Sequence, residues 1–503
     1  GRGGYDWCNN AGPGGGFGGR GGAVGADTPP PEKPALNINE GGMFRSNDGG
    51  RTFSLTSNCN ARPMYFSQVR IDPSNADIVY ASGLPWTKSM DGGKTFATLD
   101  AAGGNNSAGH VDNHAMWIDP RNPKHILIGN DGGLNVSWDQ GNTWDYVNTM
   151  ATALAYWVAA DMRRPYYVYT GLQDNGSWGG PSAVRGQDGI TNSHWYGVGG
   201  GDGFQTAIDP TAYNIIFTES QNGNTSRYDL FTGASQSIRP QPAGGGTGLR
   251  SANIAGCTDG RIGGGGGGGG GGRGGAGGRG NVLNAQDGDG ARFNWNTPYM
   301  LSPHNPRVLW YGGARVYRSD NQGDTYTQSA DLTKQIDRCT VDVMAPGNTT
   351  QLSKNDGLTS YSTIIAISES PVRAGVVWAG TDDGLVQVSR DNGKTFTEVG
   401  KNMPGLPAGH VHWIARIEAS HFEAGTAYIA VDGHRSDDLK PYAFVTNDYG
   451  ATFRSISSNL PAYGNLQVIR EDPKNPDLLY VGTEFGLYIS LNRGQSWEKF
   501  MNN

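Results

Sequence analysis

The sequence predicts an all-β protein, a β-propeller built of four-stranded blades. Three observations indicate this fold class. An octet of the form Ser/Thr-x-Asp/Asn-x-Gly-x-Thr/Ser-aromatic recurs seven times in 503 residues, and a strand–turn–strand segment precedes most of its copies. Few segments show the 3.6-residue apolar period of a helix. Small sheets repeated at a fixed period around an axis form a propeller, in which only short, protected sheet edges remain.

The octet predicts the turn between the last two strands of each unit. Its Asp/Asn and Ser/Thr side chains can bond nearby backbone groups, its Gly can adopt a positive φ, and its aromatic residue can pack beside the next sheet. We therefore expect the Asp or Asn of each octet to stabilise a blade rather than to bind a ligand. These structural residues are Asp48, Asp91, Asp139, Asn321, Asp391, Asp448 and Asn492.

A second motif predicts the first two strands of each unit. Asp-Pro and Asn-Pro turns separate two apolar strands, as in IDPSNADIVYASG from Ile71 and EDPKNPDLLYVGT from Glu471. The motifs define a half unit at 36–53 and eight full units, and we favour one main propeller with leftover strands at its ends over parts of two adjoining propellers. The units span 66–99, 114–147, 157–178, 204–238, 293–328, 362–399, 413–456 and 466–500.

Two low-complexity segments accompany the repeat array, which occupies 36–503. Residues 1–35 are rich in Gly and Pro and are expected to form a flexible leader. Residues 244–290 contain ten consecutive glycines from Gly263 and are expected to be a loop insertion between blades, replaceable by a short linker. The Arg-Gly spacing in this insertion is a weak nucleic-acid signal, which the acidic chain and the lack of stacking aromatics argue against.

Composition excludes several classes of protein. The net charge is −7, only 17% of the residues are charged, and no apolar run of 18 residues exists, so we expect neither a nucleic-acid partner nor a membrane span. The cysteines show no CxxC or Cys/His ligand spacing, so we expect no zinc site in the chain. They can form up to two disulfides in three pairings, or remain free. These cysteines are Cys8, Cys59, Cys257 and Cys339.

The octets resemble the Asp-box, or BNR, repeats of sialidases and of the sortilin-like propeller family. Other segments are similar to bacterial secreted proteins described as glycosyl hydrolase-like, among them GLQDNGSWGGPS from Gly171, RFNWNTPYMLSPHNP from Arg292 and DGHRSDDLKPY from Asp432. The resemblance covers most of 41–500 and implies a secreted, periplasmic or cell-surface protein. It also implies further units before and after this stretch, and it implies the fold more specifically than any activity.

Candidate functional residues lie where loops of different units meet at one mouth of the central channel. A lone Asp or Asn beside Gly can simply form a turn, so the convergence of many such residues is what indicates a site. The same loops also contain Asn130, Asp382, His410, His412 and Asp432. The candidate catalytic residues are Asp174, Asp202, Asp383 and Glu484, and the candidate binding residues are Asp112, His114, Asp131, Gln173, Trp178, Trp195, His434 and Arg435.

The sequence favours a binding or scaffold module for a glycan, a peptide or a partner subunit. Aromatic faces beside polar loops suit such ligands, and Trp178 and Trp195 are the tryptophans expected to be most exposed. The alternative is a glycoside hydrolase that uses two carboxyl groups about 5 Å or about 6.5–9.5 Å apart. No complete catalytic set is recognisable, the glycine runs match no phosphate-binding loop, and no cofactor is expected. A single structural calcium ion, bound by an Asp-rich turn, is left open.

Overall fold

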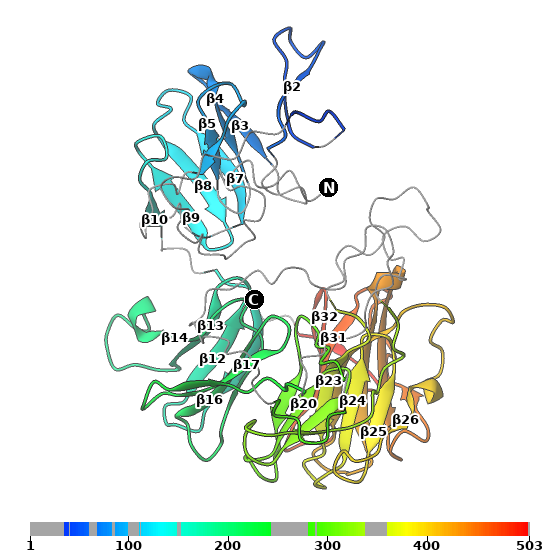
Figure 1. Cartoon of the computed structure of the whole chain (residues 1–503). Coiled ribbons are helices and arrows are strands. Elements are labelled where there is room, and N and C mark those ends of the chain that lie inside the picture. The colour runs from blue at the N-terminus through cyan, green and yellow to red at the C-terminus, as the bar shows by residue number, and fades with distance from the viewer. Residues whose placement is uncertain are drawn as a thin grey trace. The chain divides into compact units, whose positions relative to one another are not determined.

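The computed structural model describes residues 35–39, 41–59, 68–82, 86–98, 110, 112–147, 152–242, 280–286, 289–337 and 360–500. Within these ranges the protein is all-β and contains no α-helix (Figure 1). The described residues hold no helix long and apolar enough to cross a membrane. By internal contacts the chain forms two compact units, divided between Leu154 and Ala155, each with its own sheets and core.

The first unit holds a hairpin and two four-stranded sheets, which match the predicted half unit and the first two full units. Tyr80, Trp86 and Ile128 are buried in one cluster to which both sheets contribute. The hairpin pairs β1 (Met43–Arg45) with β2 (Ser54–Ser57). The sheets comprise β3 (Val69–Asp72), β4 (Asn75–Ala81), β5 (Thr87–Ser89) and β6 (Ala97–Thr98), and β7 (Asn113–Ile118), β8 (Ile126–Asn130), β9 (Gly133–Ser137) and β10 (Asp145–Val147).

The second unit holds six four-stranded sheets. In order they comprise β11 (Ala155–Ala160), β12 (Tyr167–Leu172), β13 (Gly176–Pro181) and β14 (Tyr196–Gly199); β15 (Thr206–Ile208), β16 (Ile215–Ser220), β17 (Asn224–Asp229) and β18 (Ser235–Ser237); β19 (Tyr299–Leu301), β20 (Leu309–Gly312), β21 (Val316–Ser319) and β22 (Thr327–Gln328); β23 (Ile364–Glu369), β24 (Val377–Thr381), β25 (Val386–Ser389) and β26 (Thr397–Glu398); β27 (Trp413–Ala419), β28 (Ala427–Gly433), β29 (Asp438–Thr446) and β30 (Arg454–Ser455); and β31 (Leu466–Glu471), β32 (Leu479–Thr483), β33 (Gly486–Ser490) and β34 (Glu498–Lys499). Short 3-10 helices are η2 (Asn192–His194), η4 (Gly400–Asn402) and η5 (His434–Ser436).

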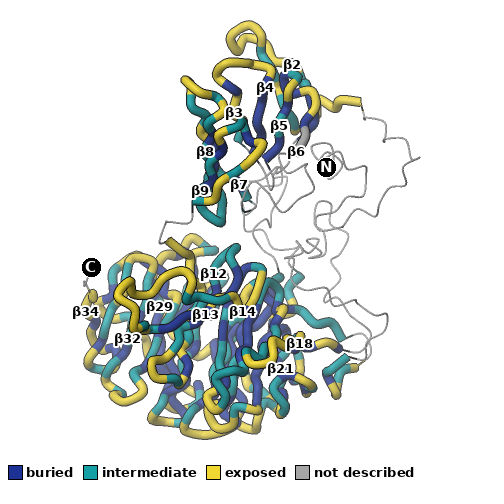
Figure 2. The backbone as a smooth tube through the Cα atoms, turned by 90° about the vertical axis from the view of Figure 1, so that its left-hand side faces the viewer, coloured by how far each residue is buried: buried dark blue, intermediate teal, exposed yellow. Residues whose placement is uncertain are grey.

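Burial along the strands follows the apolar pattern of the sequence. The strand β24 is buried at every residue because sheets pack against both of its faces, and its sequence is correspondingly apolar. The outermost strands are short and exposed, as β30 and β34 show. The buried residues of the second unit therefore concentrate in the middle strands of its sheets, such as β24, β25 and β28, and buried residues are dark blue in Figure 2.

Contacts between neighbouring sheets build the second unit into a propeller. Thr218 Oγ1 donates a hydrogen bond to the Val198 carbonyl at 3.3 Å, which joins the second sheet to the first. Similar bonds join each later sheet to its neighbour. The guanidinium groups of Arg416 on β27 and Arg470 on β31 lie 4.6 and 5.8 Å from the Trp157 ring on β11. The last sheets thus meet the first, as closure of a ring requires.

The octets form the predicted turns by the predicted hydrogen bonds. In the octet from Ser389, the serine hydroxyl donates to Asp391 Oδ1 at 2.9 Å and accepts the Gly393 N–H at 2.9 Å. The Thr395 hydroxyl and N–H donate to the Asp391 carboxylate at 2.6 and 2.9 Å and lower the pKa of Asp391 to about 2. In the octet from Ser319, Asn321 takes the place of the aspartate and forms equivalent bonds.

The predicted segment boundaries differ from the structure in two places. The unit expected at 157–178 continues to Gly199, because residues 182–195 separate its third and fourth strands in place of an octet. The end of the expected insertion is packed structure: Val282 is buried and bridges to Tyr326, and Asp289 pairs with Arg315 at 3.0 Å. Residues 1–34, and the part of the insertion at 244–279 with its glycine run, lie outside the described residues.

Candidate functional site

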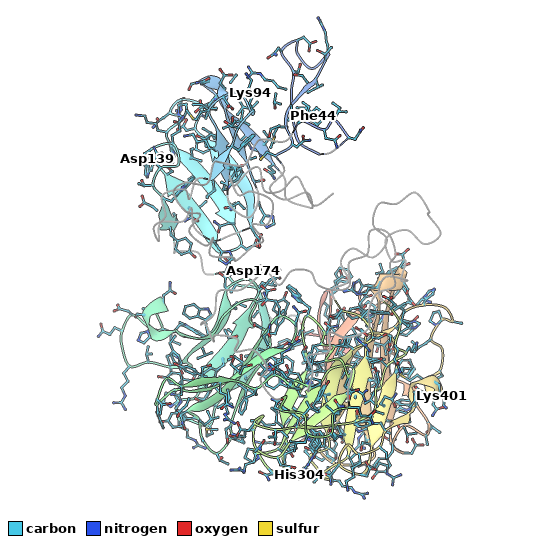
Figure 3. The ribbon with its side chains drawn as sticks, viewed as in Figure 1. Phe44, Lys94, Asp139, Asp174, His304 and Lys401 are labelled. Atoms are coloured by element: carbon cyan, nitrogen blue, oxygen red, sulfur yellow. The ribbon has the colours of Figure 1, made fainter. Side chains whose placement is uncertain are left out.

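The candidate residues of the second unit lie at one end of its sheets. The strands pair antiparallel and in sequence order, so the turn from the second to the third strand and the connection into the first strand share one end of each sheet. The octets and the Asp-Pro turns share the other end. Figure 3 shows this separation, with Asp174 at one end of the unit and His304, in a first-to-second turn, at the opposite end. We call the first end the mouth.

Most of the predicted site residues belong to the mouth of this unit. Gln173 and Asp174 follow β12, Asp202 precedes β15, Asp383 follows β24, His434 and Arg435 lie in η5, and Glu484 follows β32. Glu484 is exposed.

Some predicted residues lie elsewhere. Trp195 is not at the mouth, because it precedes β14 at the octet end, where its ring packs against Gly180. Asp112, His114 and Asp131 belong to the first unit, in which His114 Nε2 lies 2.8 Å from Asp131 Oδ1.

Asp174 and Asp202 form a hydrogen-bonded carboxyl pair at the mouth. Asp202 is 8% exposed, and its carboxyl group is close enough to that of Asp174 to share a hydrogen bond with it. Burial, the charge of Asp174 and the shared hydrogen bond raise the pKa of Asp202 to about 6. Two carboxyl groups this close do not readily ionise together, so the pair retains one proton under mildly acidic conditions.

Aromatic side chains belong to the same end of the first two sheets as this pair. Burial and the charges of Asp202 and Asp174 raise the pKa of Tyr156 to about 12. The ring centroids of Tyr156 and Phe204 lie 4.7 Å apart. Tyr156 is 38% exposed. Trp178 is exposed to the same degree, and its Nε1 donates to the Asn175 carbonyl at 2.6 Å. The pair therefore lies beside partly open aromatic rings.

The separation of the two carboxyl groups differs from that of a glycosidase. Carboxyl groups within hydrogen-bond distance are closer than the ~5 Å of retaining enzymes or the ~6.5–9.5 Å of inverting enzymes. Asp174 and Asp202 are instead expected to titrate together and to share one proton, as closely spaced carboxyl groups do.

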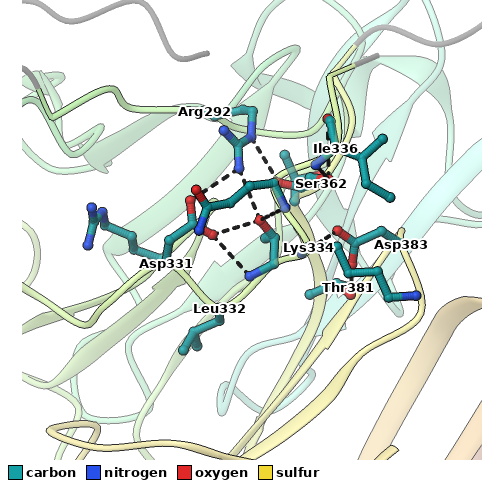
Figure 4. Close-up of polar contacts among 12 residues, drawn as sticks. Arg292, Asp331, Leu332, Lys334, Ile336, Ser362, Thr381 and Asp383 are labelled. Atoms are coloured by element: carbon teal, nitrogen blue, oxygen red, sulfur yellow. Dashed lines mark hydrogen bonds and ion pairs between the residues drawn. The ribbon is translucent and has the colours of Figure 1, made fainter. Parts of the chain in front are cut away.

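Asp383 is engaged in the structure of the mouth rather than open to a ligand (Figure 4). It is 2% exposed, and it accepts the Thr381 hydroxyl and, at 2.8 Å, the Lys334 N–H. In the same network Arg292 donates to the Ser362 carbonyl at 2.9 Å. Oδ1 of Asp383 thus braces its own turn in the fourth sheet, and Oδ2 ties that turn to the loop after the third sheet. Asn294 and Thr363 hold its neighbour Asp382 in the same way.

The fifth sheet contributes a second charged group to the mouth. His434 Nδ1 lies 2.6 Å from Asp432 Oδ2, and Gln467 Nε2 donates to the same oxygen at 3.0 Å. The Arg435 guanidinium lies 4.0 Å from the Trp413 ring. Burial lowers the pKa of Arg435, and the nearby charge of Asp432 opposes this effect.

Several buried polar atoms near these residues have no hydrogen-bond partner among the described residues. They include three N–H donors at the mouth or in the channel below it, Trp413 Nε1, Arg416 Nε and Arg435 Nε, and the acceptor Asn465 Oδ1. Buried polar groups are almost always paired in folded proteins. Sequence reasoning did not single out Arg416, because a charged residue within a β-strand resembles any exposed strand position.

A groove of about 500 Å³ lies at the octet end, between the fourth and fifth sheets. Its lining includes the octet residues Asp391 and Asp448 together with Lys401 and Tyr449. Both aspartates are already bonded to their own turns. These two carboxylates are therefore occupied by the turns that they stabilise.

The known proteins that are similar to this chain resemble it at most in fold. No protein-family model and no curated protein matches the chain. A crystal structure of the Niastella koreensis GH74 enzyme is 13% identical in sequence to this chain, with a TM-score of 0.24. The alignment covers 91% of this chain and 67% of the enzyme's chain. YCF48 from Cyanidioschyzon merolae is 12% identical, with 76% of this chain and 95% of its own covered and a TM-score of 0.35.

A third similar structure is Chaetomium thermophilum Sqt1 bound to the N-terminus of the ribosomal protein L10. It is 13% identical, covers 82% of this chain and 93% of its own, and gives a TM-score of 0.37. At these values none of the three bears on what this chain binds. The functional argument therefore rests on the residues of the mouth.

Proposed function

We propose that the chain is an extracytoplasmic binding propeller, and that a ligand rich in hydrogen-bond acceptors, most suitably a glycan, occupies the mouth of the second unit. The observation that carries this proposal is the group of buried N–H donors on Trp413, Arg416 and Arg435 that lack a partner among the described residues. Leaving a buried donor unpaired costs about 1–3 kcal/mol. A ligand that offers hydroxyl or carboxylate oxygens recovers that free energy once shifts of the surrounding side chains open these donors to it.

Exposed apolar side chains at the same end support a glycan as the ligand. Tyr463 and Phe485 are 68% and 59% exposed. They are close together, because Gly464 packs against the Phe485 ring and donates its N–H to the Leu439 carbonyl at 2.8 Å. Sugar rings present C–H faces to aromatic rings and hydroxyls to carboxylates such as the adjacent Glu484. A peptide or a partner subunit is the alternative occupant of the mouth.

The proposed location outside the cytoplasm is supported by Cys59. This residue is 1% exposed and is disulfide-bonded. Disulfides form and persist in oxidising compartments and are rare in the cytosol of most organisms.

A glycoside hydrolase is the second candidate, and one observation favours it. The pKa of Asp202 is raised to about 6, and a carboxyl group that keeps its proton in mildly acidic solution is suited to act as a general acid there. The close approach of Asp174 argues against this function, since a hydrolase needs the second carboxyl group farther away. Binding without turnover is therefore the better-supported function.

Calorimetric titration of the full chain with a panel of oligosaccharides and peptides tests the proposal. Arg435→Met and Trp413→Phe each remove one unpaired donor and are expected to weaken glycan binding at least ~10-fold. Arg454→Met, on the exposed strand β30, is the matched control and should leave affinity unchanged. Unaltered affinity in both mouth variants, with melting temperatures like that of the parent, contradicts the proposal.

Assays for turnover separate the two candidate functions. The binding function predicts that the parent protein hydrolyses none of the bound oligosaccharides. Reproducible hydrolysis that Asp202→Asn and Asp174→Asn abolish, while affinity is retained, establishes the hydrolase instead.

A further inference from the structure

Three potential metal ligands converge at the mouth of the second unit, on the fifth sheet. His410 and His412 lie on the connection into β27, and Asp438 is the first residue of β29. One ligand atom of each lies within 4.8 Å of those of the other two. His410 Nδ1 is 3.5 Å and His412 Nε2 is 3.9 Å from Asp438 Oδ2.

These separations are close to those around a single bound ion. Ligand atoms that are each ~2.1 Å from a zinc ion are about 3.4 Å apart in a tetrahedral arrangement. Small side-chain rotations would therefore bring all three atoms into the first coordination shell. A hydrogen-bonded cluster without metal would instead bring His412 Nε2 within about 3 Å of the carboxylate.

The state of His412 is an independent indication that a ligand belongs here. Its side chain is only 9% exposed, and its Nε2 atom is buried without a hydrogen-bond partner among the described residues. The same Nε2 is the atom directed towards Asp438 Oδ2. A buried imidazole nitrogen with no partner is costly, and a metal ion supplies a partner that the surrounding side chains do not.

Neighbouring groups hold the three residues in place. The Ser436 hydroxyl accepts the N–H of Val411 at 2.6 Å and lies 3.3 Å from its carbonyl, which fixes the residue between the two histidines. The Tyr442 hydroxyl donates to Asp438 Oδ2 at 2.8 Å. The Tyr442 ring also packs edge-on against His412, with centroids 6.0 Å apart. Such outer contacts orient the ligands of known metal sites.

We propose that His410, His412 and Asp438 bind one divalent transition-metal ion of the zinc class. Two imidazole nitrogens and one carboxylate favour such ions over Mg²⁺ and Ca²⁺, which prefer sets made of oxygen atoms alone. Three protein ligands leave at least one coordination position for water or a ligand atom. The exposed His410 places that open position near solvent. The site is argued without reference to a glycan and does not depend on that ligand.

One cation nearby opposes a bound metal ion. Lys334 lies close enough to His412 for its charge to affect this histidine. Lys334→Met is therefore expected to raise the affinity for the ion.

Calorimetric titration of the untagged, chelator-treated full chain with Zn²⁺ tests the proposal. We expect one equivalent to bind, no matching signal with Mg²⁺ or Ca²⁺, and visible d–d absorption when Co²⁺ replaces Zn²⁺. His412→Ala and His410→Ala should each weaken Zn²⁺ binding well over ~10-fold, and Tyr442→Phe about 10-fold, as outer-shell losses do. Because His410 is exposed, its variant is expected to fold even if the His412 variant does not.

His434→Ala is the matched control, because His434 is a mouth histidine that pairs with Asp432 instead of joining the cluster. It should leave Zn²⁺ affinity and the Co²⁺ spectrum unchanged. The proposal is overturned if the parent binds no Zn²⁺, or if His410→Ala binds as well as the parent. It is equally overturned if His434→Ala loses as much affinity as the cluster variants.

Discussion

Arg470 donates a hydrogen bond to Glu418 at 2.7 Å, between the first strands of two neighbouring sheets. The Arg470 guanidinium also lies 5.8 Å from the Trp157 ring, on the first strand of the first sheet. Arg470 thus links its own sheet, the sixth, to the fifth and the first sheets of the second unit. Burial raises the pKa of Glu418, and the charge of Arg470 opposes this effect.

Replacing Arg470 by Met is therefore expected to destabilise the second unit by about 1–3 kcal/mol at pH 7. The substitution leaves the Glu418 carboxylate, whose side chain is 14% exposed, without its cation. Denaturant unfolding should show the loss, and Arg454→Met on exposed β30 should show none. Equal stability of the two variants would mean that the ion pair does not contribute to ring closure.

The octet hydrogen bonds predict the effect of two substitutions at Asp391. Asp391→Ala removes the acceptor of the Ser389 and Thr395 bonds and should lower the free energy of unfolding by about 1–2 kcal/mol. Asp391→Asn is the matched control, because Asn321 fills the same position in another octet. Asn should retain most of the stability. Since Asp391 also lines the octet-end groove, loss of glycan binding in a variant of unchanged stability would refute its structural role.

The pH dependence of the same site follows from its carboxylate. The pKa of Asp391 falls from 3.8 to about 2 in the folded protein, because hydrogen bonds from Thr395 favour the ionised form. A lowered folded-state pKa adds stability above the unfolded pKa and loses it as pH falls through the folded value. The advantage of the parent over Asp391→Asn should therefore shrink between about pH 4 and pH 2 in thermal unfolding. A difference that is constant across this range contradicts the assignment.

The sequence predicts the octet turns well because all their bonds are local. Ser389, Asp391 and Thr395 are within seven positions of one another, so the residue types alone specify the turn. The carboxyl pair is different. Asp174 and Asp202 were each candidates, but their pairing depends on how two sheets bring separate loops together, which no local pattern encodes.

Other parts of the site were missed for related physical reasons. Asp438 follows Asp437 in a turn-like stretch, where an aspartate is most simply explained as a turn residue. Its position beside His410 and His412 becomes visible only in the folded structure. Trp195 was expected at the mouth, yet the loop replacing an octet carries it to the opposite end of its sheet.

Asp202→Asn is expected to stabilise the protein at neutral pH. The pKa of Asp202 is raised from 3.8 to about 6, so between these values the folded state binds more protons than the unfolded state. Stability contributed by the protonated group is fully present below about pH 4 and is lost as pH rises through 6. An asparagine amide can donate to Asp174 as the protonated carboxyl group does, at every pH.

The gain from this substitution should be about 1–3 kcal/mol at pH 7 and should nearly vanish at pH 4, measured as free energies of unfolding at both values. Asp188→Asn, at an exposed position in the loop after β13, provides the control and should change stability at neither pH. A destabilised Asp202→Asn at pH 7 would show that folding favours the ionised form of Asp202, which a raised pKa does not allow. The shared proton would then be excluded, and with it the explanation of the raised pKa by the proximity of Asp174.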